Sequence, residues 1–276
     1  MRAFIELSNA LKPEIGHVLA ANKYLEFREQ GTTGFGDRLR GISLLAFLTS
    51  FYRVKKVVYE ANSSEAFPWN LTDLITIEGL EFISREQASL LPKLIEIDHD
   101  CARGTIIKRF GYKHMRRLRP RSQQMTQKLD SLEVGPAHIG IHIRTTDSAH
   151  KIASHVDEDM DPNNAVLQSI HAAIRKYKYS HAYLACDSLA ARTTWSTLLA
   201  RHTDLKICWN PEAKYDDSRL RQTSADDMIT DFFALSRCGY LVRSVPSEFS
   251  RFAALVGGLK MNYNQLEGRL NTRIKP

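Results

Sequence analysis

A short segment in the second half of the chain brings a histidine, an arginine and an aspartate close together. It reads His142-Ile143-Arg144-Thr145-Thr146-Asp147 and continues an alternation of isoleucines with polar residues. Residues two apart on a strand share a face, so His142 and Arg144 point the same way. An arginine at the end of a buried strand needs an anionic partner. A diphosphate would supply one through charge-assisted hydrogen bonds, and an internal Arg144–Asp147 ion pair is the alternative.

Two further positions suit a nucleotide. Asp231 lies among apolar residues in the segment 228–233, where a carboxylate needs hydrogen-bond donors. Guanine offers two adjacent N–H donors that one carboxylate can accept together. Ser247 precedes a helical pattern, so a phosphate there would meet a hydroxyl, backbone N–H groups and the positive end of the helix dipole. Ordinary N-capping is the alternative for Ser247.

A glycine turn and a terminal aspartate are also candidates. Gly34 and Gly36 flank Phe35, and Arg38 follows. Paired glycines let the backbone approach a ligand closely, and the helix start that follows favours an anion. A tight turn with solvated arginines is the alternative. Asp187 closes an apolar strand, where its carboxylate can bind ribose hydroxyls or, more commonly, cap the next helix.

Alternating strands and helices must position these residues. In the second half the patterns predict strands over 139–143, 182–186, 205–209 and 240–242, and helices over 165–177, 190–201, 226–236 and 249–259. In the first half, strands over 24–27 and 54–59 flank the glycine turn and a helix. This order is typical of open parallel sheets, in which ligands bind beyond the C-terminal strand ends. We therefore expect an α/β protein of GT-B type, with two Rossmann-like domains, residues 1–130 and 131–276, facing each other across a cleft.

Composition narrows the class of partner only in part. Among 276 residues, Lys and Arg number 38 and Asp and Glu 31, which gives a formal net charge of +7. Such an excess suits nucleic acid, an anionic membrane or a nucleotide diphosphate. The densest basic stretch, 113–124, carries no nucleic-acid motif and no aromatic stacking platform. A nucleic-acid-binding protein that uses Arg116, Arg117, Arg119 and Arg121 is the rival from another class.

Membrane, export and metal signals are weak. No apolar run approaches the roughly 20 residues of a membrane span, and the N-terminus does not have the pattern of a signal peptide, so the sequence predicts a cytoplasmic protein. The four cysteines form no C-x-x-C pair. The acidic clusters 157–159 and 226–227 are typical of a solvated loop and a helix start, and neither follows a strand. We expect no metal site.

The second half resembles the donor-binding domain of the α1,6-fucosyltransferases. The segments that carry this resemblance are 139–147, 183–187, 231–236 and 240–251, and residues 34–39 are similar to the glycine loop of the acceptor-side domain. The resemblance implies an inverting, metal-independent enzyme that moves fucose from GDP-fucose, or a related GDP-sugar, to a glycan hydroxyl without a further cofactor. A transferase of the same fold that uses another nucleotide sugar is the alternative.

Carried over by position, the resemblance implies a role for most of these residues. Arg144 would hold the diphosphate, while His142 and Asp231 would contact guanine. Asp187 would serve the nucleoside end and Ser247 a phosphate. The predicted catalytic residues are Arg144 and Asp147, and the predicted donor-binding residues are Gly34, Gly36, Arg38, His142, Arg144, Asp187, Asp231, Ser247, Glu248 and Arg251.

Three departures from the family leave its finer chemistry open. The family has a second arginine where this chain has Thr145, and a lysine where it has Ser148. The segment that follows is also shorter here, so no general base is assigned by position. The acceptor and the linkage stay open for the same reason.

Overall fold

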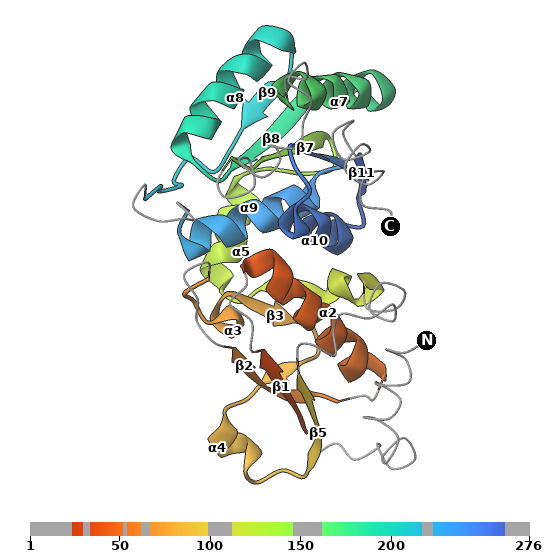
Figure 1. Ribbon diagram of the computed structural model, residues 1–276, viewed down its shortest axis with the longest axis vertical. Coiled ribbons are helices and arrows are strands. Elements are labelled where there is room, and N and C mark those ends of the chain that lie inside the picture. The colour runs from red at the N-terminus through yellow and green to blue at the C-terminus, as the bar shows by residue number, and fades with distance from the viewer. Residues whose placement is uncertain are drawn as a thin grey trace, which may run out of the picture. The chain divides into compact units, whose positions relative to one another are not determined.

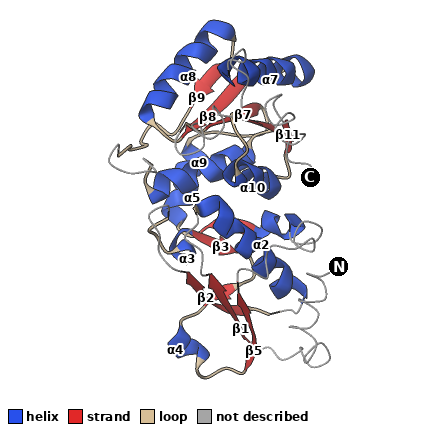
Figure 2. Ribbon diagram, in the orientation of Figure 1, coloured by secondary structure: helices blue, strands red, loops and turns tan. Residues whose placement is uncertain are grey.

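The structure is a computed structural model that describes residues 24–29, 34–51, 54–61, 67–98, 112–145, 162–216 and 223–262. The chain divides into two compact units, Met1–Ser122 and Gln123–Pro276. Each is an α/β unit with a parallel sheet (Figures 1 and 2). The boundary expected after residue 130 falls within helix α5 (Gln123–Ser131), which belongs to the second unit.

The first unit has a four-stranded sheet in the order β4-β2-β1-β5, in which all pairs are parallel. A separate antiparallel pair joins β3 to β6. The strands are β1 (Tyr24–Glu29), β2 (Lys56–Ala61), β3 (Ile75–Ile77), β4 (Glu81–Phe82), β5 (Lys93–Asp98) and β6 (Leu118–Pro120). The helices are α2 (Phe35–Phe51), α3 (Leu71–Leu74), α4 (Arg85–Ala88) and the 3-10 helix η4 (Tyr112–Arg117).

Helix α2 starts directly at the glycine turn. The carbonyl of Gly34 accepts hydrogen bonds from the backbone N–H groups of Asp37 and Arg38, at 3.1 and 3.2 Å. Leu39, Ile42 and other apolar residues of α2 are buried, as their near-helical spacing predicts. The expected strand–turn–helix–strand order is therefore present around this turn.

The basic stretch is partly tied into the first unit. The Arg117 guanidinium donates from Nε to the backbone carbonyl of Glu78 at 3.0 Å, and Arg119 Nη2 lies 3.0 Å from the Glu78 carboxylate. These bonds link the end of η4 and the start of β6 to the turn after β3. Two of the four arginines that the nucleic-acid hypothesis uses thus have partners inside the protein.

The second unit has a five-stranded parallel sheet in the order β11-β10-β7-β8-β9. Every strand and helix expected in this half is present, with ends that differ by a few residues. The strands are β7 (His138–Ile143), β8 (His181–Cys186), β9 (Lys206–Cys208), β10 (Tyr240–Arg243) and β11 (Lys260–Asn262). The helices besides α5 are α7 (Pro162–Tyr177), α8 (Leu189–His202), α9 (Ala225–Arg237) and α10 (Glu248–Gly257).

Helices cover both faces of this sheet, α7 and α8 on one side and α9 and α10 on the other (Figure 1). The strand period decides which residues face which layer. Ile139, Ile141 and Ile143 of β7 join the apolar core beneath α7 and α8. The alternate residues Gly140 and His142 therefore face α9 and α10.

Two glycines allow close packing on the α9–α10 side. A Cβ at Gly140 would lie 3.1 Å from a methyl carbon of Leu235, so the missing side chain lets α9 lie against β7. A Cβ at Gly257 would lie 1.9 Å from the carbonyl oxygen of Ser236. Because that atom belongs to the backbone, α9 and α10 touch backbone to backbone at this point.

Candidate functional site

The ends of β7 and β8 are joined by hydrogen bonds. Both carboxylate oxygens of Asp187 accept from the backbone N–H of Thr145 at 3.0 Å, and Oδ1 also accepts from the Thr145 hydroxyl at 3.0 Å. Capping of α8, the alternative for Asp187, is done by the next residue, because the Ser188 hydroxyl accepts from the N–H of Ala191. Asp187 thus holds the backbone immediately after Arg144.

The loop between β10 and α10 is fastened to the same strand end. The Ser244 hydroxyl accepts from the backbone N–H of Arg144 at 2.9 Å, and the Ser244 N–H donates to the carbonyl of His142 at 2.9 Å. The buried guanidinium of Arg243 donates from Nη1 to the Ser247 carbonyl at 3.1 Å. Arg144 and the start of α10 therefore lie at one edge of the sheet.

Ser247 occupies the N-cap position of α10 but does not act as a cap. Three other serines in the chain, Ser84, Ser188 and Ser224, accept a hydrogen bond at their helix starts from a backbone N–H three residues on. Ser247 is only 5% exposed and makes no such bond. Its hydroxyl has no hydrogen-bond partner within the part of the chain that the structure describes. A buried, unpaired hydroxyl at a helix start suits an anionic ligand.

His142 is packed beneath the first turn of α10. Its Nδ1 lies 3.0 Å from the Ser250 hydroxyl, and its ring stacks on Phe249 with 5.0 Å between centroids. Nδ1 is thus used to hold α10 in place. His142 therefore lies under the first turn of α10.

Glu248 and Arg251 bind each other across the first turn of α10. The Arg251 Nη1 lies 3.1 and 3.3 Å from the two carboxylate oxygens of Glu248. Both side chains are half-buried. The Glu248 carboxylate also places negative charge in the first turn, which the helix dipole favours.

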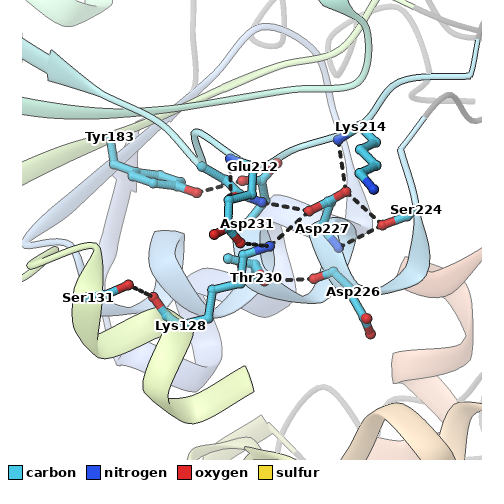
Figure 3. Close-up of polar contacts among 11 residues, drawn as sticks. Lys128, Ser131, Tyr183, Glu212, Lys214, Ser224, Asp226, Asp227, Thr230 and Asp231 are labelled. Atoms are coloured by element: carbon cyan, nitrogen blue, oxygen red, sulfur yellow. Dashed lines mark hydrogen bonds and ion pairs between the residues drawn. The ribbon is translucent and has the colours of Figure 1, made fainter. Parts of the chain in front are cut away.

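Asp231 is buried in α9 and faces β8. Its Oδ1 accepts a hydrogen bond of 2.6 Å from the phenol of Tyr183 (Figure 3). Burial raises the pKa of Asp231 from its ordinary 3.8 to about 7, even though the Tyr183 bond acts in the opposite direction. The expectation that this carboxylate needs a donor is confirmed, and Tyr183 supplies it.

One turn earlier, Asp227 is the centre of a polar network that the sequence interpretation missed (Figure 3). Its carboxylate accepts from Asn210 at 2.8 Å, from the Lys214 backbone N–H at 3.0 Å, and from the Ser224 hydroxyl at 2.7 Å, and it pairs with Lys128 at 3.1 Å. Burial alone would raise the pKa of Asp227, but these donors outweigh burial and lower it. The Ser-x-x-Asp spacing of a capped helix start was the available signal.

The glycine-turn candidates belong to the first unit. Gly34 is buried, and the side chain of Arg38 is fully buried with its guanidinium 4.9 Å from the centre of the Phe67 ring. The alternative of solvated arginines is therefore wrong for Arg38. Arg40 is half-buried, and its guanidinium lies 3.5 Å from the carboxylate of Asp37.

Three further expectations concern Asp147, metal ligands and membrane-spanning helices. Asp147 lies outside the described residues. Within the described ranges, no three His, Cys, Asp or Glu side chains gather as metal ligands do. No helix among the described residues has the length and apolar character of a membrane span.

Comparison with known proteins finds solved structures of similar fold. No protein-family model and no curated protein matches the chain. Among solved structures it is similar to POFUT1 in complex with GDP, with a TM-score of 0.57 and 10% identity over 89% of this chain and 99% of that one. It is also similar to the NodZ alpha-1,6-fucosyltransferase soaked with GDP-fucose, with a TM-score of 0.51 and 16% identity over 86% and 93% of the two chains.

A third solved structure agrees with these two. The fucosyltransferase NodZ from Bradyrhizobium matches with a TM-score of 0.50 and 16% identity over 86% of this chain and 94% of that one. At such identities the likeness establishes a shared fold. The chain therefore has the two-unit α/β fold of these fucosyltransferases, which is the GT-B class expected from its sequence.

Proposed function

We propose that the protein is an inverting glycosyltransferase that moves fucose from GDP-fucose to a hydroxyl of a glycan. The observation that carries the proposal is the buried hydroxyl of Ser247 at the start of α10, which has no partner among the described residues and lies at the strand edge of Arg144. A diphosphate bound there would pair with Arg144 and accept from Ser247 and the backbone N–H groups of the helix start. The solved structures of similar fold are bound to GDP or soaked with GDP-fucose, which supports this choice of donor.

The same arrangement suits the chemistry of the transfer. When the glycosidic bond to the donor phosphate breaks, negative charge develops on the β-phosphate of the leaving GDP. Arg144 and the start of α10 would stabilise that charge without a metal ion. The sugar gains oxocarbenium character, and the acceptor hydroxyl attacks from the opposite face. Asp147 remains the second predicted catalytic residue, and no general base is assigned.

The base-recognition half of the proposal rests on Asp231. Its carboxylate would accept the N1–H and the 2-amino group of guanine together. Uracil has only one N–H on its pairing edge and adenine has no adjacent pair of this kind, so the carboxylate favours guanine. Asp187 was expected at the nucleoside end; in this proposal it instead serves the diphosphate by holding the backbone that follows Arg144. A cytoplasmic location stays a prediction.

A thermal-shift comparison of GDP, UDP, ADP, CMP and GDP-fucose tests the proposal. A ligand that binds only the folded state raises the unfolding temperature. We expect GDP and GDP-fucose to raise it and UDP to have little effect. Equal shifts with UDP and GDP would favour a transferase for another nucleotide sugar. Binding of an oligonucleotide that weakens steeply with salt, without any GDP response, would favour the nucleic-acid hypothesis.

A further inference from the structure

The hydrogen bond between the buried residues Tyr183 and Asp231 fixes the orientation of the Asp231 carboxylate. Tyr183 is fully buried in β8, on the face opposite the apolar core, and its phenol reaches α9. Within the described part of the chain, its hydroxyl is the side-chain donor that bonds Asp231. The carboxylate torsion of an aspartate is broad and nearly two-fold, so without this bond the plane of the carboxylate would be weakly defined.

We propose that Tyr183 is a positioning residue that sets the plane of the Asp231 carboxylate and thereby the selectivity for guanine. The inference rests on the proposed function and adds to it the group that makes base recognition selective. A carboxylate has about four acceptor positions. The phenol uses one of these positions. Three remain in the plane of the carboxylate, and the N1–H and the 2-amino group of guanine need two of them. A carboxylate rotated out of that plane would accept only one of them well.

The other charged and titratable groups around Asp231 come from several elements. They are Cys186 on β8, Asp227 on α9, Lys128 on α5, Arg192 on α8 and Tyr215 in the loop after β9. The two cations have other contacts. Lys128 pairs with Asp227 at 3.1 Å, and the Arg192 guanidinium stacks 5.0 Å from the centre of the Tyr215 ring. They act on Asp231 at longer range, which leaves Tyr183 as its direct donor.

This arrangement makes donor binding depend on pH. Guanine donates two hydrogen bonds, so it needs the ionised carboxylate, whose pKa burial raises to about 7. Affinity for GDP should therefore fall as the pH drops below about 7. The Tyr183 bond favours the ionised form, so its removal should move the midpoint of the affinity profile to higher pH.

The test compares Tyr183→Phe with Tyr240→Phe, a change at another buried tyrosine of the same sheet. Affinities for GDP and for inosine diphosphate, which lacks the 2-amino group, are measured by calorimetry from pH 6 to 8.5. Tyr183→Phe should weaken GDP binding by about tenfold and inosine diphosphate binding by less. Its midpoint should also move to higher pH, while Tyr240→Phe keeps both the selectivity and the midpoint of the wild type.

The outcomes separate this inference from the proposed function. If folded Tyr183→Phe keeps the wild-type ratio of GDP to inosine diphosphate affinity and the wild-type midpoint, the inference is wrong while the proposed function stands. If the wild type itself binds GDP no better than UDP, the proposed function fails first. Should Tyr183→Phe not fold, 3-fluorotyrosine at position 183 keeps the size and strengthens the donor. It should move the midpoint to lower pH, and an unmoved midpoint would overturn the inference.

Discussion

The carboxylate of Asp187 binds the backbone N–H of Thr145 through both of its oxygens, each at 3.0 Å. This contact joins the C-terminal end of β8 to the end of β7. Thr145 directly follows Arg144, so the backbone at Arg144 is anchored through an aspartate that lies 42 residues after Thr145. In the proposed function, Asp187 would therefore influence the diphosphate site without touching the donor.

Replacing Asp187 by alanine should lower both donor affinity and turnover, because Thr145 and the preceding Arg144 lose their anchor. We expect a loss of roughly tenfold or more in kcat/KM for GDP-fucose. Steady-state kinetics with varied donor measure it. Asp130→Ala is a control in the same unit, since Asp130 forms an exposed ion pair with Arg237 at 2.8 Å and such pairs contribute little. Equal kinetics for both variants would contradict the anchoring role.

Arg144→Ala should be the most damaging single change to catalysis. Removing a group that stabilises developing charge typically costs about 10²–10³-fold in turnover. Arg144→Lys should also be severely impaired, since an ammonium keeps the charge but loses the planar fork. The measurement is the turnover number of each variant after its folding has been checked. Arg201→Ala, on the exposed face of α8, is the control and should keep the wild-type turnover. Near wild-type turnover in folded Arg144→Ala would refute our account of leaving-group stabilisation.

Ser247→Ala should weaken GDP binding without destabilising the fold. The Ser247 hydroxyl is buried without a partner in the described structure, and such a group costs about 1–3 kcal/mol of stability. Its removal should leave the free energy of unfolding unchanged or raise it, while affinity for GDP falls about tenfold. Denaturant unfolding and calorimetry measure the two effects.

Ser84→Ala is the matched control for Ser247→Ala. Ser84 forms a true capping box with Gln87, so its loss should cost about 1 kcal/mol of stability and leave GDP affinity unaltered. A Ser247→Ala variant that is as destabilised as Ser84→Ala would show that Ser247 is an ordinary cap.

Asp231→Asn should stabilise the protein at alkaline pH and abolish selective GDP binding. The folded-state pKa of Asp231 is raised above its ordinary 3.8, to about 7. Stability from the neutral carboxyl is therefore full below pH 3.8 and is lost as the pH rises towards 7. The loss is at most about 4 kcal/mol. Asparagine has no such loss, so its advantage should grow from pH 4 to pH 7 and then level off. Thermal unfolding at several pH values measures this, and a constant difference would contradict it.

EDTA should leave sugar transfer intact, because in the proposed mechanism Arg144 and the start of α10 would supply the positive charge that a metal would otherwise bring. The measurement is initial rate with and without chelator, in enzyme passed over a chelating resin. Loss of activity that manganese restores would show that the metal-free mechanism is wrong.

Much of the second unit could be predicted because its apolar residues alternate or recur with clear periods. β7 is an example, since three isoleucines define its buried face. Helix α5 was missed because only Met125 and Leu129 of its residues are buried, a pattern too short to recognise beside a basic stretch. Its Lys128 pairs with Asp227 of α9 at 3.1 Å, a contact between distant segments that no local pattern encodes.

The candidate site was predicted in part for the same reason. The predicted strand ends indicated Arg144 and Asp187 as candidates. They did not indicate which groups the residues around these two positions bind. The partner of His142 is Ser250, 108 residues away, and Arg38 is buried against Phe67 on a different segment. Such pairings arise from tertiary packing. The sequence around Ser247 is also that of an ordinary helix cap, so it does not reveal that the hydroxyl lacks a partner among the described residues.

The backbone contact at Gly257 has a consequence for how this protein could diversify. Asp231 lies on α9 and Ser247 begins α10, and these two helices meet where Gly257 touches Ser236. At this point their spacing is set by main-chain atoms. If a nucleotide binds as proposed, side chains at either of its ends could change one at a time during evolution, while this contact would keep the length of nucleotide that fits the same.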